Sequence, residues 1–127
     1  MRRVENRSEL DGWDSVAFGM ALDMDRGRWV LRLSGELDLS TAPLFQQECQ
    51  AVLKTGCREL YVDLGDLQFI DSAGLAALLI LYRESLAQSC SLVLVDELGR
   101  QERLFALTHL ESIMPLQRNG PAATAAP

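Results

Sequence analysis

The chain has 127 residues, of which 48% are hydrophobic and 24% are charged, and its formal net charge is -6 at pH 7. This length fits one globular domain, and the acidic balance argues against nucleic acid or an anionic membrane surface as a partner. The longest apolar run, residues 73–82, is shorter than the roughly 20 residues of a membrane-spanning helix, and the first ten residues lack a signal-peptide core, so we expect a cytoplasmic protein.

The predicted elements follow the order β-β-α-β-α-β-α. Alternating apolar residues predict two strands, about residues 16–24 and 28–35, which form a hairpin with Gly27 at positive φ. The elements that follow are a helix over about 42–55, a strand over about 59–64, a helix over about 72–87, a buried strand over about 92–95 and a helix over about 100–107. The first helix is capped by Ser40 or Thr41 and carries Pro43 in its first turn.

This order predicts an α/β fold, a single domain with a small mixed β-sheet and helical crossovers. The folded unit spans about residues 16–116. Residues 1–15 are mostly polar without an apolar period, which predicts a flexible N-terminal extension. Residues 117–127 are rich in alanine and proline and predict a flexible tail.

Three cysteines, Cys49, Cys57 and Cys90, are odd in number, are widely separated in the sequence and show neither CxxC nor metal-site spacing. We interpret them as buried, reduced thiols, which fits a reducing compartment.

No other residue pattern predicts a metal or cofactor. The pairs Asp23/Asp25 and Asp96/Glu97 have no further ligands spaced to close a coordination sphere, so we expect solvated loop charges there. His109, the sole histidine, is expected at the surface or at a helix end rather than in a catalytic role.

The topology brings two unusual loops together. If strands 28–35 and 59–64 are parallel, their C-terminal ends open on the same edge of the sheet, where partners and ligands are commonly met. The loops at 35–43, GELDLSTAP, and 65–74, GDLQFIDSAG, then form one surface that includes Asp38 and Ser72. The candidate site lies on that surface.

Ser72 has two interpretations. Its hydroxyl can cap the following helix by accepting a hydrogen bond from the backbone N–H of Gly74 or Leu75. However, Asp71 already supplies a side chain that can cap the helix, and Gly74 permits another backbone to approach closely. An exposed serine at a helix N-terminus can instead accept a phosphoryl group, which the local amides and dipole favour. Such a phosphate would make a mildly acidic, partly apolar surface strongly negative and would eject a docked partner.

These residues resemble the STAS domain of bacterial anti-sigma factor antagonists. The resemblance covers about residues 16–116 and rests on GELDLSTAP at 35–43 and VDLGDLQFIDSAGLAALL at 62–79, with support from SLVLVD at 91–96 and RLFALTHL at 103–110. It implies that Ser72 is phosphorylated by a cognate anti-sigma factor that is itself a serine kinase. The unphosphorylated form would bind this kinase and free a sigma factor, and a serine phosphatase would restore it after phosphorylation.

The resemblance further implies that Asp38 assists partner recognition and that ATP belongs to the kinase, so this chain is no enzyme and needs no cofactor. The expected partner-binding residues are Asp38, Leu39, Ser40, Thr41, Asp71, Ser72, Ala73, Gly74 and Leu75. The chain departs from the family pattern at Ala73, where a second hydroxyl is frequent, and at Thr108-His109-Leu110, where Thr-Gly-Leu is common.

Three other functions remain as alternatives. A hydrolase would need Gly-x-Ser-x-Gly around Ser72 and a nearby base, but Phe69 and Ile70 stand where small residues are required. Nucleotide binding would need GxxxxGK[ST], or GxGxxG after a strand, and neither is present. The stronger alternative is a constitutive STAS interaction module in a stress-signalling assembly or beside a lipid transporter, not controlled by phosphorylation.

Overall fold

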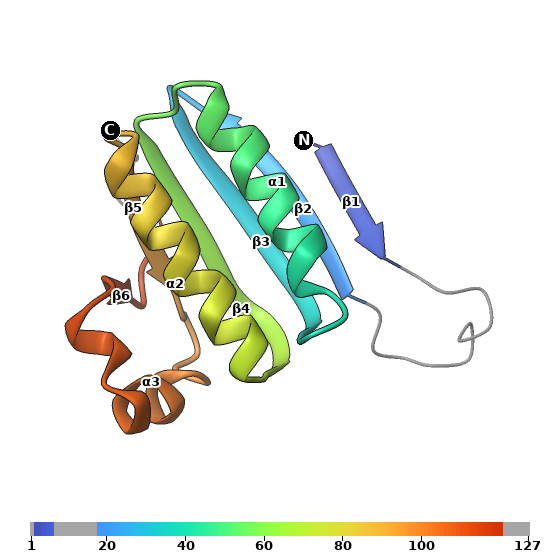
Figure 1. Ribbon diagram of the computed structural model, residues 1–127, viewed down its shortest axis with the longest axis vertical. Coiled ribbons are helices and arrows are strands. Elements are labelled where there is room, and N and C mark those ends of the chain that lie inside the picture. The colour runs from blue at the N-terminus through green and yellow to red at the C-terminus, as the bar shows by residue number, and fades with distance from the viewer. Residues whose placement is uncertain (1, 7–17, 121–127) are drawn as a thin grey trace.

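The computed structural model describes residues 2–6 and 18–120. These residues form one six-stranded sheet in the order β1-β2-β3-β4-β5-β6, with helices inserted between the parallel strands (Figure 1). The elements are β1 Arg2–Asn6, β2 Phe18–Asp25, β3 Arg28–Leu37, α1 Ala42–Lys54, β4 Glu59–Ile70, α2 Ser72–Ala87, β5 Ser91–Val95, α3 Glu102–Thr108, the 3₁₀ turn Leu110–Ser112 and β6 Leu116–Gln117. The predicted α/β class with a mixed sheet is confirmed.

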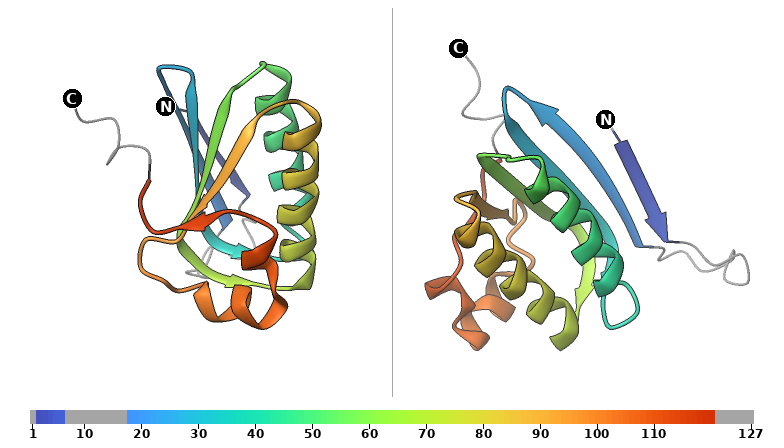
Figure 2. Two further views of the ribbon diagram at one scale, coloured as in Figure 1. Left: turned by 90° about the vertical axis from the view of Figure 1, so that its left-hand side faces the viewer. Right: turned by 45° about the horizontal axis from the view of Figure 1, so that its top comes forward.

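Helices α1 and α2 lie side by side on one face of the sheet (Figures 1 and 2). Each buries an apolar stripe against the strands, as the 3.6-residue period predicts. The stripe of α1 contains Phe45, Cys49, Val52 and Leu53, and that of α2 contains Ala77, Leu78 and Leu81. Within the described part of the chain, no helix is both long and apolar enough to cross a membrane.

The β2–β3 hairpin forms as predicted. Its strands pair antiparallel from Gly19 opposite Ser34 to Asp25 opposite Arg28. The two turn residues, Arg26 and Gly27, have φ values of 55° and 81°. A turn with two positive φ values matches the right-handed twist of the strands, and glycine adopts such values without steric cost.

Strand β4 is longer than the predicted 59–64 and reaches Ile70. It pairs parallel with β3 but contains two register shifts. From Arg32 opposite Asp63 to Ser34 opposite Asp66, and again from Gly35 opposite Leu67 to Glu36 opposite Phe69, β4 advances one residue more than β3. Each extra residue breaks the two-residue alternation, so this part of the strand has a loop-like sequence. Much of the predicted loop 65–74 is therefore strand.

The two chain ends also differ from the sequence prediction where the structure describes them. Residues 2–6 pair antiparallel with β2, and residues 116–117 pair parallel with β5, although both segments fall at or within the predicted flexible ends. Both strands add backbone hydrogen bonds to an edge of the sheet, and such pairing needs no apolar period in the added strand. Residues 7–17, which include the predicted start of the first strand at Val16, and residues 121–127 lie outside the described residues.

Candidate functional site

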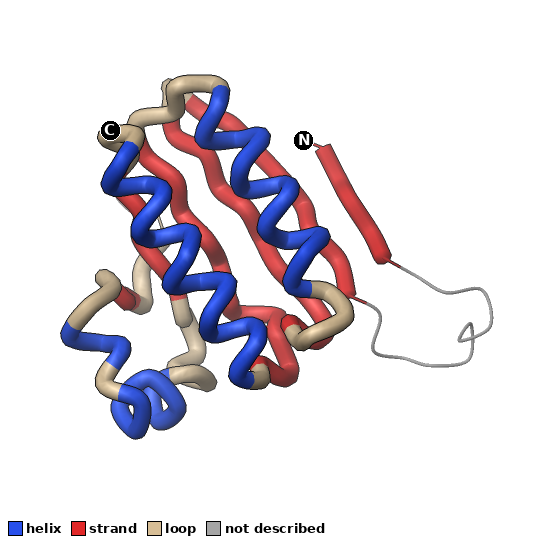
Figure 3. The backbone as a smooth tube through the Cα atoms, viewed as in Figure 1, coloured by secondary structure: helices blue, strands red, loops and turns tan. Residues whose placement is uncertain are grey.

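The C-terminal ends of β3 and β4 lie side by side, as the topology predicts. Leu37 is the partner of Ile70 at the end of the ladder, and the backbone N–H of Asp71 donates to the carbonyl of Leu37 at 3.2 Å. The turns before α1 and α2 therefore meet at one end of the sheet (Figure 3). This end is the candidate site.

Asp38 organises the turn before α1. Its Oδ1 accepts hydrogen bonds from the backbone N–H groups of Ser40 at 3.0 Å and Thr41 at 3.1 Å, and from the Ser40 hydroxyl at 2.7 Å. The Ser40 hydroxyl above all, together with these N–H groups and against the opposing effect of desolvation, holds the pKa of the Asp38 carboxyl below its ordinary value. Thr41 is the N-cap residue of α1, as one of the two predicted choices, but its side chain makes no capping hydrogen bond. Its hydroxyl is bonded to the carbonyl of Glu36 instead.

The hydroxyl of Thr41 braces the same turn. Its Oγ1 donates to the carbonyl of Glu36 at 2.9 Å and accepts from the backbone N–H of Asp38 at 2.9 Å. The residue is only 6% exposed, so it holds the backbone in place instead of offering contact surface. Pro43 lies in the first turn of α1, as predicted.

Asp71 joins the two turns. Its Oδ1 accepts from the backbone N–H of Gly74 at 2.9 Å and thereby caps α2. Its Oδ2 accepts from the backbone N–H of Leu39, in the turn before α1, at 3.2 Å. One carboxylate therefore satisfies an open donor of α2 and fixes the position of the neighbouring turn.

Ser72 is the first residue of α2, and its side chain is exposed. Because Asp71 caps the helix, the Ser72 hydroxyl is not needed for capping, and it makes no hydrogen bond to any residue that the structure describes. A free hydroxyl at a helix N-terminus is placed where the backbone amides and the helix dipole favour an added phosphate.

Gly74 allows α2 to start directly against β3. A Cβ atom at this position would collide with the carbonyl oxygen of Leu37 and would lie 2.9 Å from Cγ2 of Ile70. Such distances are too short for any residue but glycine, so the predicted close backbone approach is confirmed. Like Thr41, Gly74 is buried and shapes the site from beneath.

The remaining predicted partner-binding residues differ in exposure. Leu39 is 77% exposed, and Ser40 is also exposed. Ala73 and Leu75 are half-buried, and Leu75 packs against the core. They therefore contribute less surface than Leu39.

Phe69 is a surface residue that sequence reasoning missed as part of the site. It is 49% exposed and lies three positions before Ser72, in the part of β4 that pairs with Glu36. The signal in the sequence is a large aromatic residue inside a segment predicted to be a loop. Phe69 and Leu39 place exposed apolar area on the two neighbouring segments that lead to the site.

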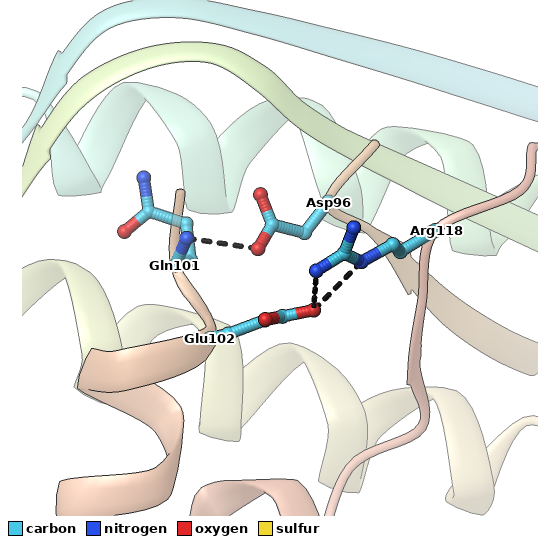
Figure 4. A network of polar contacts seen from close by, with 4 residues as sticks. All are labelled: Asp96, Gln101, Glu102 and Arg118. Carbon is cyan, nitrogen blue, oxygen red and sulfur yellow. Dashed lines mark hydrogen bonds and ion pairs between the residues drawn. The ribbon is translucent and has the colours of Figure 1, made fainter. Parts of the chain in front are cut away.

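Asp96 corrects another expectation. The sequence predicts a solvated loop charge, but this residue is 1% exposed and its Oδ2 accepts from the backbone N–H of Gln101 at 2.8 Å, where α3 begins. Beside it, Glu102 pairs with Arg118 through an Nη2 to Oε1 distance of 2.6 Å (Figure 4). A carboxylate at a helix start satisfies an open N–H group, although the other oxygen of Asp96, Oδ1, is buried without a hydrogen-bond partner among the described residues. Arg118 lies in the predicted flexible tail.

Among residues 2–6 and 18–120, no group of three or more histidine, cysteine or acidic side chains is arranged to hold a metal ion. His109 is exposed and ends α3 with φ of 60°, so its predicted place at a helix end is confirmed.

Comparison with known proteins gives consistent results. Residues 20–116 match the family described as "Mlab, STAS domain". The chain is 30% identical over 99 residues to the anti-sigma F factor antagonist of Paenibacillus polymyxa, covering 77% of this chain and 85% of that protein. It resembles the crystal structure of an anti-sigma factor antagonist from Mycobacterium paratuberculosis, with a TM-score of 0.76 and 26% identity over 87% of this chain and 93% of that one.

A further solved structure shows the fold alone, because the identity is 23%. It is the Bacillus cell fate determinant SpoIIAA in its phosphorylated form, with a TM-score of 0.64, covering 83% of this chain and 96% of that one.

Proposed function

Because the chain belongs to the STAS-domain family that includes the bacterial anti-sigma factor antagonists, we propose that it is a partner switch controlled by phosphorylation at Ser72. In this proposal the unphosphorylated protein binds a cognate anti-sigma factor that is a serine kinase, and the sigma factor is released. Phosphorylation of Ser72 abolishes this binding in the cytoplasm, and a serine phosphatase restores it.

The observation that carries the proposal is the free hydroxyl of Ser72. Asp71 caps α2, so Ser72 is exposed at the helix start with no competing hydrogen bond to a described residue. The hydroxyls of Ser40 and Thr41, which lie on the neighbouring turn, are bonded to Asp38 and Glu36. Among these three hydroxyls, Ser72 alone is ready to react without breaking an existing contact.

The surface around Ser72 suits a neutral docking state. We call Asp38, Leu39, Ser40, Phe69 and Ser72 the docking edge. Leu39 and Phe69 are 77% and 49% exposed and provide apolar anchors. A phosphate on Ser72 adds roughly -1.5 to -2 charges to this edge. A partner whose surface fits the unmodified serine offers no positive group to pair with this phosphate. To bind the phosphorylated protein it would have to remove water from an unpaired charge, which costs several kcal/mol.

The phosphate need not disturb the domain itself. The first N–H groups of α2 point toward the helix start, where they and the helix dipole stabilise an anion. SpoIIAA, which shares the fold, is known in a phosphorylated form. Support for an anti-sigma factor as partner comes from the Paenibacillus polymyxa relative, which is named an anti-sigma F factor antagonist.

The test is incubation of the protein with its candidate anti-sigma kinase and ATP, followed by peptide mass spectrometry. We expect one phosphate, located on Ser72. The Ser91→Ala variant is the matched control, because it removes an exposed hydroxyl at the start of β5, away from the docking edge, and leaves Ser72 in place, so it should be phosphorylated to the same extent. Phosphate on another residue, or none with any cognate kinase, contradicts the switch.

Binding measurements separate the switch from a constitutive module. Ser72→Asp should weaken kinase binding, whereas Ser72→Ala should bind persistently and resist release by ATP. Equal affinities of the two variants for the kinase would favour a constitutive STAS module. Labelling of Ser72 by a fluorophosphonate probe would instead favour the hydrolase alternative.

A further inference from the structure

Two of the three cysteines meet at the end of the sheet opposite the docking edge. Cys57 follows α1 and precedes β4, and Cys90 follows α2 and precedes β5 (Figure 1). The two side chains are 7% and 3% exposed, and their Sγ atoms are 3.1 Å apart. Between them, the backbone N–H of Ser91 donates to the carbonyl of Arg58 at 2.8 Å. This bond holds the two chain segments at a fixed separation.

We propose that Cys57 and Cys90 are a redox modification site, at which hydrogen peroxide drives formation of a reversible intramolecular disulfide. Adjacent strands lie about 4.8 Å apart, and Cα atoms of disulfide-bonded cysteines are usually about 4.4–6.8 Å apart, so neighbouring strand starts can be bridged. The sulfurs have only to close to about 2.05 Å, a movement that side-chain rotation can supply.

The oxidation proceeds in two balanced steps. The thiolate of one cysteine attacks a peroxide oxygen, the O–O bond breaks, and a sulfenic acid and hydroxide form; the hydroxide takes the proton that the thiol released and becomes water. The sulfur of the second cysteine then attacks the sulfenic sulfur, the S–O bond breaks, and the hydroxyl leaves as a second water with the remaining thiol proton. Each sulfur loses one electron, and the peroxide is reduced to two waters.

Burial makes the reaction slow. Desolvation first, and then the neighbouring Cys57 thiol, raises the pKa of Cys90 to about 12, so its reactive thiolate is scarce at neutral pH. The pair therefore stays reduced under the ordinary conditions of a reducing compartment and responds to sustained peroxide. Cys49 is 1% exposed, and burial raises the pKa of its thiol well above the ordinary value. Among the described residues, the sulfur of Cys49 makes no contact with the sulfur of another cysteine, unlike those of Cys57 and Cys90.

The disulfide would close a loop that contains β4 and α2. Closing a loop restricts the unfolded chain and stabilises the folded domain. Ser72 lies at the other end of α2, whose 16 residues span about 24 Å. We therefore expect oxidation to change stability without changing access to Ser72, and this inference does not depend on the partner switch.

The test is treatment of the native chain with hydrogen peroxide, followed by thiol blocking, digestion and mass spectrometry without reductant. We expect a monomer that has lost two hydrogens, a cross-linked peptide pair containing Cys57 and Cys90, and a free Cys49. The Tm should rise by roughly 10 °C and return to its initial value with dithiothreitol.

Two variants make the result specific. Cys90→Ser should abolish the cross-link and the Tm rise, and Cys49→Ala should retain both. The mapping on the native chain keeps the proposal testable if a variant folds poorly. Free thiols at both positions after prolonged peroxide, a cross-link through Cys49, a disulfide between two chains, or oxidation to sulfinic acid without a cross-link would each overturn the proposal.

Discussion

The turn before α1 and the turn before α2 each place an aspartate directly after one of two parallel strands, but they differ in what the aspartate holds. Asp38 accepts hydrogen bonds within its own turn, including one from the Ser40 hydroxyl at 2.7 Å. Asp71 accepts from Gly74 in its own turn and from Leu39 in the other turn. Asp38 therefore makes its hydrogen bonds only within the first turn among the described residues, whereas Asp71 bonds to both turns. Because Asp71 caps α2, the hydroxyl of Ser72 is not used for capping.

Position alone therefore does not make a hydroxyl available for modification. Ser40 and Ser72 are both exposed and both lie near a helix start. Ser40 stabilises the ionised form of Asp38, so a reaction at its oxygen would remove an existing hydrogen bond. Ser72 has no such role, because the capping carboxylate is one residue before it. Substitutions at four positions, Gly74, Asp71, Asp38 and Ser72, test this difference between the two turns.

The largest effect is expected at Gly74, where the start of α2 lies directly against the end of β3. In Gly74→Val the new side chain collides with the carbonyl of Leu37, so α2 must move away from β3. We expect the free energy of unfolding to fall by about 3 kcal/mol. Urea unfolding measures this loss.

Gly120→Val is the matched control, since apart from the chain neighbours of Gly120 no atom of a described residue lies within 4 Å of a Cβ at that position. Its free energy of unfolding should change by less than about 0.5 kcal/mol. Equal losses in the two variants would show that α2 does not depend on close contact with β3.

Asp71 is expected to give the next largest effect. Asp71→Ala removes both the helix cap and the bond to Leu39, and we expect a loss of about 2 kcal/mol. Asp71→Asn keeps an oxygen for the N–H of Gly74 but presents an amide NH₂ to the N–H of Leu39, so about half of that loss should remain. The comparison by urea unfolding isolates the contribution of the link between the turns.

Asp66→Asn serves as the control, because it makes the same change at an exposed aspartate in β4. If Asp71→Asn and Asp66→Asn have the same free energy of unfolding, the hydrogen bond between Asp71 and Leu39 contributes nothing to stability.

Much of the structure around the docking edge could be predicted from the sequence, because the residues that start and end a helix are close together in the chain. The bounds of α2, 72–87, follow from an apolar period and from cap residues next to it. The meeting of the two turns follows from parallel strands joined by a right-handed crossover. By contrast, the hydrogen bonds of the side chains before α1 depend on competition among neighbouring polar groups. Only the folded turn shows that Asp38 accepts from the N–H groups of Ser40 and Thr41 and that no side chain caps α1.

Other features depend on pairing between distant segments and could not be predicted. The end of β4 was missed because its buried residues Leu64, Leu67 and Ile70 are three apart, a spacing produced by the register shifts against β3. The exposure of Phe69 follows from the same shifts. Similarly, the contact between Cys57 and Cys90 depends on the register of β4 and β5, which the spacing of cysteines in the sequence does not show.

A smaller effect, confined to acid, is expected at Asp38. The folded protein holds the pKa of this carboxyl below its ordinary value of 3.8. The unfolded chain therefore binds the proton more readily, and the stabilisation is present above about pH 4 and is lost as the pH falls through the lower folded pKa. We call the fall in the free energy of unfolding between pH 4 and pH 2 the acid limb. Asp38→Asn cannot take up this proton, so its acid limb should be less steep than that of the wild type.

Urea unfolding at several pH values measures the acid limb, and Asp66→Asn again provides the matched change at an exposed aspartate. An acid limb of Asp38→Asn that parallels the wild type would contradict the role of Ser40 and the turn amides in stabilising the ionised carboxyl.

The smallest effect, and the sharpest test of the contrast, is expected at Ser72. Ser72→Ala removes a hydroxyl that bonds to no described residue, so the free energy of unfolding should change by less than about 0.5 kcal/mol. Ser40→Ala makes the identical change on the other turn but removes the hydrogen bond to the Asp38 carboxylate, so it should cost about 1 kcal/mol. Urea unfolding of both variants at neutral pH measures the difference. If Ser72→Ala is the more destabilised of the two, its hydroxyl holds the fold and is not free for phosphorylation. If only Ser40→Ala loses stability, the serine that can be modified is the one that the fold does not need.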